Sequence, residues 1–166
     1  MKSEAADFAA ELVLRDVETA DVPVFFAQQL DPDAHHMAAF TSGNPADEAA
    51  FTARWTRILA DPNVTAKAIV HAGRVIGHVA SFGPREEREV TYWLGKEYWG
   101  RGLATRALAA FLRGLRERPL HARAATDNRA SIRVLEKCGF ALVRRETSFA
   151  AGRGREIEEA VMTLSA

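Results

Sequence analysis

The sequence predicts an α+β fold built on a central, largely antiparallel sheet. Strand-like and helix-like segments follow in the order strand, two helices, three strands, helix, strand, helix and two strands. The three consecutive strands are separated by short turns, as in an antiparallel meander. A strand, a helix and another strand between Val90 and Ala125 should instead form a right-handed parallel crossover. With 166 residues, we expect a single domain that spans residues 1–166.

The first half of the chain is predicted to hold one strand and two helices before the meander. Residues 1–10 should be poorly ordered, and apolar alternation places a strand at residues 11–15. A helix should begin near residues 19–23, where a proline fits the first turn. Residues 30–45 contain two prolines and a glycine and are expected to be irregular. Asp47 is then predicted to cap the second helix.

The second half should alternate between strands and helices. A long helix is predicted to follow a glycine turn and to run to about Arg118, because Pro119 cannot continue it. A shorter helix should be capped within residues 126–128 and end at Gly139. Strands are expected at residues 65–71, 75–82, 89–94, 120–125, 141–149 and 156–164.

The composition is that of an ordinary globular protein, with 48% hydrophobic and 27% charged residues. The formal net charge is zero, which removes the general electrostatic argument for nucleic acid or an anionic membrane as a partner. Cys138 is the one cysteine, so an intrachain disulfide is excluded, and no metal-ligand cluster is visible in the sequence. No apolar run approaches the roughly 20 residues of a membrane helix, so a soluble cytoplasmic protein is predicted.

A glycine-bearing turn separates the strand at 89–94 from the long helix. Gly100 and Gly102 lack a Cβ, so another molecule can approach the backbone closely. The first N–H groups of a helix have no acceptor within it, and the helix dipole adds partial positive charge. The turn therefore favours an anion such as a phosphate or pyrophosphate. Thr105 stands at the third glycine of the Rossmann fingerprint and no Walker A pattern is present, so both familiar nucleotide motifs fit badly.

Two motifs resemble those of a known enzyme superfamily. Trp99-Gly-Arg-Gly-Leu-Ala resembles the Q/R-x-x-G-x-G/A acetyl-CoA motif of the GCN5-related N-acetyltransferases (GNAT). The segment from Asn128 to Phe140 begins N-x-x-S, ends in G-F, and is similar to the superfamily's second CoA segment. The Tyr-Trp-Leu strand end and the Tyr-Trp-Gly entry are similar to the branch of the ribosomal-protein N-terminal acetyltransferases RimJ and RimL. The order of elements fits this superfamily from Leu12 to Leu164.

The resemblance implies the GNAT fold, with about six to seven mostly antiparallel strands, about four flanking helices, and a splay between the fourth and fifth strands. It also implies acetyl-CoA as the acetyl donor and no metal. The pantetheine arm would lie in the splay, where a backbone N–H near Trp93 or Leu94 would polarise the thioester carbonyl. The pyrophosphate would be held by backbone N–H groups of Gly100, Arg101, Gly102, Leu103, Ala104 and Thr105.

Several side chains near the two motifs have open roles. Arg101 and Arg106 either add charge-assisted contacts to the CoA phosphates or form a solvated helix face. Trp99 occupies the family's Gln/Arg position, so one polar pyrophosphate contact is lost there. Asn128 either hydrogen-bonds the pantetheine arm or only caps its helix.

The implied reaction is direct attack of a primary amine on the thioester, which requires a group that takes the amine's proton. Glu89 is the candidate base and Glu146 is a second one, whereas a surface acid beside Arg88 is the alternative interpretation of Glu89. Ser131 either donates to the leaving thiolate or only binds CoA. Leu135 stands where many relatives carry the tyrosine that protonates the thiolate, so that acid cannot be carried over.

The acceptor is open between a protein N-terminus and a small amine. His35 and His36, expected in a loop after the first helix, either contact this acceptor or are simply solvated. A non-catalytic acetyl-CoA sensor or interaction module with the same fold is the alternative to an enzyme. Dimers are common in the family and terminal strands offer edges that can pair, so a homodimer is a possible assembly.

Overall fold

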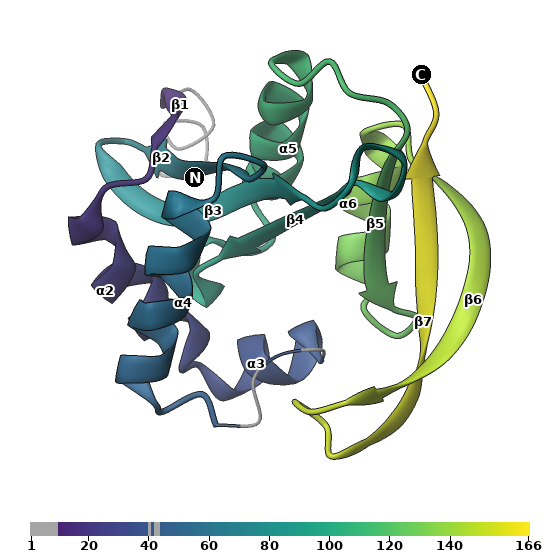
Figure 1. Cartoon of the computed structure of the whole chain (residues 1–166), viewed down its shortest axis with the longest axis horizontal. Helices are drawn as coiled ribbons and strands as arrows, with labels where there is room; N and C mark the ends of the chain where they lie inside the picture. The colour runs from purple at the N-terminus through teal and green to yellow at the C-terminus, as the bar shows by residue number, and fades with distance from the viewer. Residues whose placement is uncertain (1–9, 40, 42–43) are drawn as a thin grey trace.

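The computed structural model of the chain describes residues 10–39, 41 and 44–166. Of the segment expected to be poorly ordered, residues 1–9 lie outside this range. One sheet of seven strands runs through the described residues in the order β1-β2-β3-β4-β5-β7-β6. Five α-helices and three short 3₁₀ helices accompany it (Figure 1), so the predicted α+β class is confirmed.

The strands begin and end close to the predicted positions. They are β1 (Leu12–Asp16), β2 (Thr65–His71), β3 (Arg74–Phe82), β4 (Glu89–Leu94), β5 (Leu120–Ala125), β6 (Ala141–Ala150) and β7 (Arg155–Leu164). The helices are α2 (Val22–Gln29), α3 (Pro32–Ala38), α4 (Glu48–Ala60), α5 (Leu103–Arg113) and α6 (Arg129–Lys137). The 3₁₀ helices are η1 (Thr19–Asp21), η2 (Arg85–Glu87) and η3 (Lys96–Tyr98).

The parallel pair β4–β5 opens almost as soon as it forms. Its ladder contains one residue pair, Glu89 with His121, next to a 2.8 Å bond from His121 N to Arg88 O. On its other edge, β4 pairs with β3 over its whole length, from Glu89 to Leu94. The two strands therefore meet at their starts and separate toward their carboxyl ends. This is the splay that the family resemblance predicts between the fourth and fifth strands.

Helices cover the two faces of the sheet unevenly. Val90 and Leu94 of β4 and Leu120 of β5 face α5 and α6 within the larger hydrophobic core. A smaller core joins Phe25 of α2 and Trp55 of α4 to the opposite face of β2. In Figure 1, α2 and α4 lie beside β1–β3, whereas the long β6–β7 hairpin curves away at the other end of the sheet. On the face opposite α5 and α6, the C-terminal strands β5, β7 and β6 are therefore covered by fewer helices than β1–β3.

The segment predicted to be irregular contains a helix, and that prediction is wrong. Asp31 caps α3, because its Oδ1 accepts the N–H groups of Asp33 and Ala34 at 2.9 and 3.0 Å. Pro32 stands at the first helical position, where its missing N–H has no intrahelical role. The helix ends after two turns at Ala39, whose φ is +62°. A helix of seven residues is too short to show a helical repeat of apolar residues, and prolines at both ends of the segment indicate a loop.

Helix α5 is shorter than predicted. It ends at Arg113, and Gly114 closes it with an N–H bond to the carbonyl of Phe111 at 3.1 Å. The expected end near Arg118 is therefore wrong by about one helical turn, because glycine at a helix end stops the helix before the proline does. Its predicted start is confirmed, since the helix begins directly after Gly102.

Candidate functional site

The glycine turn leaves the backbone in front of α5 open. Gly100 and Gly102 both have φ of +74°, a conformation that only glycine adopts readily. A Cβ built at either glycine has no described atom within 4 Å beyond its chain neighbours. The first bond of this helix runs from Arg106 N to Gly102 O at 3.2 Å, so the preceding N–H groups of residues 103–105 have no acceptor within the helix. This geometry fits the predicted cradle for a diphosphate.

Two side chains near the glycine turn, Trp99 and Arg106 of α5, form hydrogen bonds to the backbone of other segments. The indole Nε1 of Trp99 donates to the carbonyl of Leu94 at 3.0 Å and so ties the turn to the end of β4. Arg106 Nη2 donates to the carbonyl of Ala10 at 3.1 Å, while Arg101 and Trp99 lie at the surface. Trp99 is thus a fixed wall beside the glycine turn.

The backbone of β4 decides which amide group faces the splay. Gly95 N bonds to Ile76 O of β3 at 2.9 Å, whereas Arg88 O accepts from β5. Because successive residues of a strand direct their N–H and C=O groups to opposite edges, those of Tyr92 and Leu94 face β5. The same alternation directs the N–H of Trp93 toward β3. Of the two candidates for the thioester carbonyl, Leu94 therefore has its N–H on the splay.

Asn128 caps α6 and also forms a hydrogen bond to α3. Its Oδ1 accepts the N–H of Ser131 at 3.2 Å, which caps α6, and its Nδ2 donates to the carbonyl of Met37 on α3 at 3.3 Å. Ser131, in the first turn of α6, has its Oγ 2.8 Å from the phenol oxygen of Tyr92. Sequence reasoning missed Tyr92; the strand alternation that groups it with Val90 and Leu94 was the available signal.

Both sequence candidates for the base meet on one arginine. Arg123 of β5 donates from Nε to Glu89 at 3.1 Å, and from Nη1 to Glu146 at 2.7 Å and Glu159 at 2.9 Å. We call these four residues the Arg123 cluster. The cluster lies on the face of the sheet opposite α5 and α6, because Glu89 alternates with the core residue Val90. Sequence reasoning missed Arg123 and Glu159, which come together only through strand pairing.

Charge in the Arg123 cluster shifts two ionisation equilibria. The hydrogen bonds to Glu146 and Glu159 raise the pKa of Arg123 despite partial burial, so this guanidinium is permanently charged. Hydrogen bonds from Arg144 and Arg123 lower the pKa of Glu146. The three carboxylates outnumber the two guanidinium groups bound to them. The cluster therefore carries net negative charge on this face.

Helix α3 spans the open side of the splay and carries both predicted acceptor histidines. Asp33 forms an ion pair with Lys96 of η3, just beyond the end of β4. At the other end, the carbonyls of His36 and Ala39 accept from Arg153 Nε at 2.9 Å and Gly152 N at 2.8 Å in the β6–β7 hairpin. The ring of His35 is engaged by Thr41 Oγ1 at 2.7 Å. The histidines are thus on a helix, not in the expected loop.

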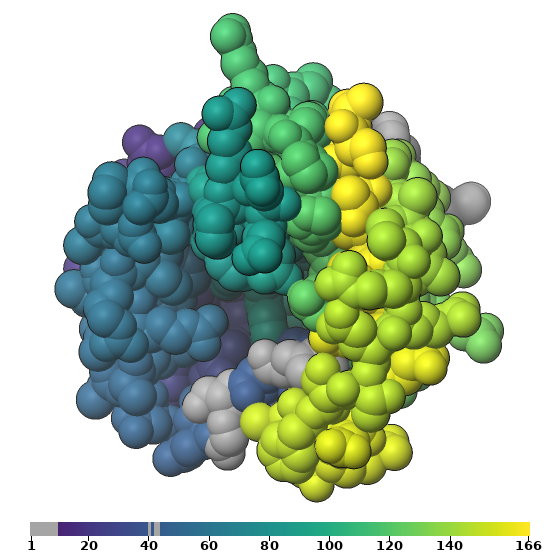
Figure 2. Space-filling view, turned by 45° about the vertical axis from the view of Figure 1, so that its right-hand side comes forward, coloured from purple at the N-terminus to yellow at the C-terminus, as the bar shows by residue number. Residues whose placement is uncertain are grey.

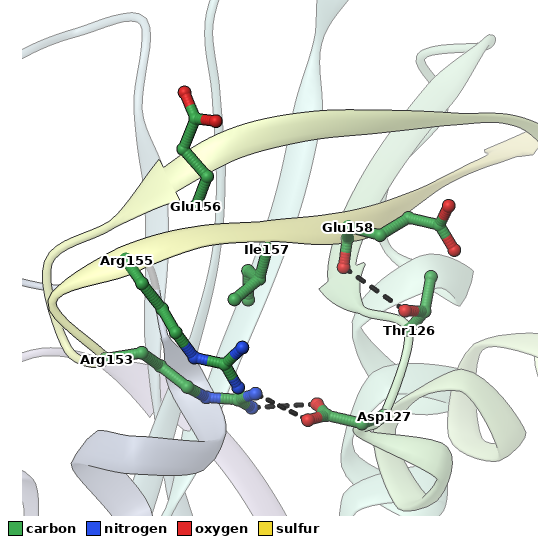
Figure 3. Close-up of a pocket in the computed structure, with 7 residues that line it drawn as sticks. All are labelled: Thr126, Asp127, Arg153, Arg155, Glu156, Ile157 and Glu158. Carbon is green, nitrogen blue, oxygen red and sulfur yellow. Dashed lines mark hydrogen bonds and ion pairs between the residues drawn. The ribbon is translucent and has the colours of Figure 1, made fainter.

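A polar pocket of about 300 Å³ adjoins the contacts between α3 and the β6–β7 hairpin (Figure 3). Arg153 and Arg155 extend from the hairpin toward Asp127, and Arg153 forms two bonds to its carboxylate at 2.5 and 2.8 Å. The Arg153 side chain is 2% exposed, and its hydrogen bonds to Asp127, together with its charge, lower the pKa of that carboxyl. This ion pair holds the hairpin against the turn that precedes Asn128.

The surface is hollowed on the α4 side of the sheet. Figure 2 shows a recess between the blue segment that includes α4 and the yellow-green β6–β7 hairpin. Within the described residues, no group of three or more His, Cys, Asp and Glu side chains is arranged to hold a metal ion. No described helix combines the length and apolar character needed to cross a membrane.

Comparison with known proteins places this geometry in a family. A family model described as an acetyltransferase (GNAT) domain matches residues 11–141, well over half of the chain. No curated protein matches the sequence. Many solved structures share the fold.

Three of these structures were solved with CoA or one of its derivatives. Vibrio cholerae spermidine N-acetyltransferase, in complex with CoA and spermine, has a TM-score of 0.81 at 16% identity and covers 93% of this chain and 95% of its own. Mycobacterium smegmatis RimJ, in complex with CoA-disulfide, has a TM-score of 0.75 at 20% identity, and the match covers 93% of this chain and 82% of RimJ. The microcin C7 self-immunity acetyltransferase MccE, with acetyl-CoA and AMP, has a TM-score of 0.77 at 14% identity over 94% and 93%.

At identities this low, the structural similarity shows only that these proteins share a fold with this chain. The family model is the stronger finding, because it spans β1 to the start of β6 and includes the splay, the glycine turn and both helices that flank them. The chain belongs to the acetyltransferase (GNAT) domain family.

Proposed function

We propose that this protein transfers an acetyl group from acetyl-CoA to a primary amine by direct attack of the amine on the thioester. The observation that carries the proposal is the open backbone at Gly100 and Gly102 in front of α5, beside strands that separate toward the same end. Helix N-termini bind anions, and a splayed strand edge can pair with an amide-rich chain. We also propose that the chain acts as one acetyltransferase domain.

The residues around the splay would divide the work. Backbone N–H groups at residues 100–105 would hold the pyrophosphate, with Arg101 and Arg106 near enough along the chain to add charge. Acetyl-CoA supplies the thioester, and the N–H of Leu94 would polarise its carbonyl. Asn128 would contact the pantetheine arm from the cap of α6. The N–H of Leu94 faces the splay and that of Trp93 faces β3, which supports Leu94 as the donor to the thioester carbonyl.

The Arg123 cluster supports an amine as the acceptor. An ammonium group is attracted to a face where carboxylates are in excess, and it must lose a proton before it attacks. Glu89 lies at the vertex of the splay, on the face opposite the cofactor helices, and would accept this proton directly or through water. His35 and His36 on α3 border the same side and would contact the acceptor. Spermine bound to the Vibrio cholerae enzyme is consistent with a small amine.

An acetyl-transfer screen tests the proposal. Purified protein would be incubated with acetyl-CoA and a panel of N-terminal peptides and small amines, and products would be read by mass spectrometry. We expect at least one amine to gain one acetyl group. Binding of acetyl-CoA by calorimetry, together with silence across the whole panel, would instead favour the non-catalytic sensor. Absence of acetyl-CoA binding would reject both functions.

The RimJ/RimL-like branch, a cytoplasmic location and a homodimer remain predictions. Strands β1 and β6 end the sheet, and each has one edge without a partner strand among the described residues. Leu142, Val143 and Phe149 of β6 are 48–64% exposed, which favours β6 as the edge that meets a second copy. Sedimentation of the purified chain would distinguish monomer from dimer.

A further inference from the structure

A short hydrogen bond joins the two sides of the splay. Tyr92 lies on β4, and Ser131 lies in the first turn of α6, directly after β5. Their side-chain oxygens are 2.8 Å apart, and the phenol oxygen is also 3.5 Å from the Ser131 carbonyl. Tyr92 packs against the larger core, so its hydroxyl has a restricted position. The bond therefore fixes a serine hydroxyl beside the gap that opens between β4 and β5.

The chemistry of the two hydroxyls favours one direction for this bond. A phenol is more acidic than an aliphatic alcohol, so it is the better donor and the poorer acceptor. The Ser131 Oγ is thus the natural acceptor from Tyr92. Once this oxygen accepts, its own hydrogen is available for another partner. Burial raises the pKa of Tyr92 to about 12, so its proton stays in place at neutral pH.

The position of Leu135 makes this pair important. Leu135 stands where the family resemblance implies a tyrosine donor, and it is 1% exposed within the core, with no hydroxyl to offer. We propose that Tyr92 is a positioning residue, which holds the Ser131 hydroxyl so that its hydrogen points to the sulfur leaving the thioester. This inference rests on the proposed function and adds the residue that orients the donor.

The proposed step balances without a net proton from the pair. The amine lone pair forms the C–N bond, the C–S bond breaks, and its electron pair passes to sulfur. The proton that the attacking nitrogen loses is equal to the one that the thiolate finally takes up. A thiol has a pKa near 8.5, about three and a half units below the pKa of Tyr92, so a transfer from the phenol to sulfur is unfavourable. Ser131 therefore stabilises the thiolate by a hydrogen bond, and Tyr92 keeps that bond aligned.

Steady-state kinetics with the amine found in the screen test the pair. We expect Tyr92→Phe to lower kcat about 10-fold, with KM for acetyl-CoA changed less than about twofold, because the bond to sulfur strengthens only as charge develops. Ser131→Ala should lower kcat further, and the double variant should match Ser131→Ala. Thr56→Val is the control, since it removes a hydroxyl that donates to the Thr52 carbonyl at 3.0 Å on α4, away from β4 and β5. Fully additive losses, or an equal loss in Thr56→Val, would overturn the proposal.

A second measurement needs no acceptor. CoA labelled with ¹³C at the carbon bonded to sulfur reports the thiol pKa by NMR when bound to the protein. We expect this pKa to be roughly half a unit to one unit higher in Tyr92→Phe and Ser131→Ala than in wild type. Equal values in all three proteins that bind CoA would reject the inference while leaving the proposed function intact. Failure of wild type to bind CoA would instead reject the function.

A gentler change guards against misfolding of Tyr92→Phe. The chain contains two tyrosines, so 3-fluorotyrosine in a Tyr98→Phe background modifies Tyr92 alone. Fluorine makes the phenol a stronger donor, and the thiol pKa of bound CoA should then fall. A rise or no change relative to Tyr98→Phe would contradict the proposed direction of the hydrogen bond.

Discussion

Arg123 Nε donates to the Glu89 carboxylate at 3.1 Å, at the vertex where β4 and β5 part. The carboxylate that the sequence singles out as a base is therefore also a structural ion-pair partner. The guanidinium also holds this carboxylate in one orientation, so replacing Glu89 removes both a candidate base and an ion-pair partner. Function and structure at this residue must be separated by experiment.

Glu89→Gln should lower kcat for amine acetylation by about 10²-fold, since general-base catalysis contributes in this range. Glu159→Gln is the matched control, because it removes another carboxylate bound to the same arginine, at 2.9 Å, and Glu159 is not a candidate base. We expect Glu159→Gln to lose less than a factor of ten. Equal losses in the two variants would assign the effect to the ion-pair network and not to a base. Initial rates against pH for each protein provide the measurement.

Gly102→Ala should abolish acetyl-CoA binding. The new Cβ would enter the open space in front of α5, and the residue would be held at φ of +74°. Gly154→Ala provides the control, since Gly154 has φ of +65° in the β6–β7 hairpin and equally open surroundings. Both variants should lose about 1 kcal/mol of stability from backbone strain. In calorimetry, retention of acetyl-CoA affinity by Gly102→Ala would reject this cradle.

Arg153→Ala should loosen the bridge between α3, the β6–β7 hairpin and the turn before Asn128. It removes two bonds to Asp127 and one to the His36 carbonyl, and the side chain is buried. We expect a loss of about 2 kcal/mol in urea unfolding. Arg145→Ala should cost about 0.5 kcal/mol or less, because Arg145 makes an exposed pair with Glu158 at 3.8 Å. Similar losses in both variants would show that the bridge contributes no special stability.

His78→Phe should change how stability depends on pH. The His78 ring makes T-shaped contacts with Phe25 and Trp55 at centroid distances of 4.7 and 4.8 Å, and burial lowers the pKa of His78 from 6.5 to about 3. Below pH 6.5 the unfolded chain binds a proton that the folded chain does not. Stability is therefore fully present above pH 6.5 and should fall by about 1.4 kcal/mol per unit as pH drops toward 3.

The phenylalanine variant keeps an aromatic ring against Phe25 and Trp55 and removes the group that binds the proton. Urea unfolding at several pH values between 4 and 7 should give a difference between wild type and His78→Phe that changes with this slope. Parallel curves for the two proteins would contradict the lowered pKa of His78.

The local patterns were sufficient for most of the fold. Alternation located every strand within about two residues, since each strand has one face on a core. The helix missed at residues 32–38 is two turns long and relies on an Asp31 cap, a signal too short for periodicity. The end of α5 differs from the prediction because Gly114 stops the helix before Pro119 is reached.

The sequence by itself determined the glycine turn, the two motifs and most strands and helices, because each depends on residues that are close together in the chain. The resemblance of the two motifs to a known superfamily then implied the splayed α+β sheet. Only the tertiary structure decided that Glu89 and Glu146 share Arg123, that Tyr92 holds Ser131, and that α3 spans the splay. These contacts join residues 23 to 117 positions apart. Strand order and register create them, and no local pattern encodes which distant side chains will meet.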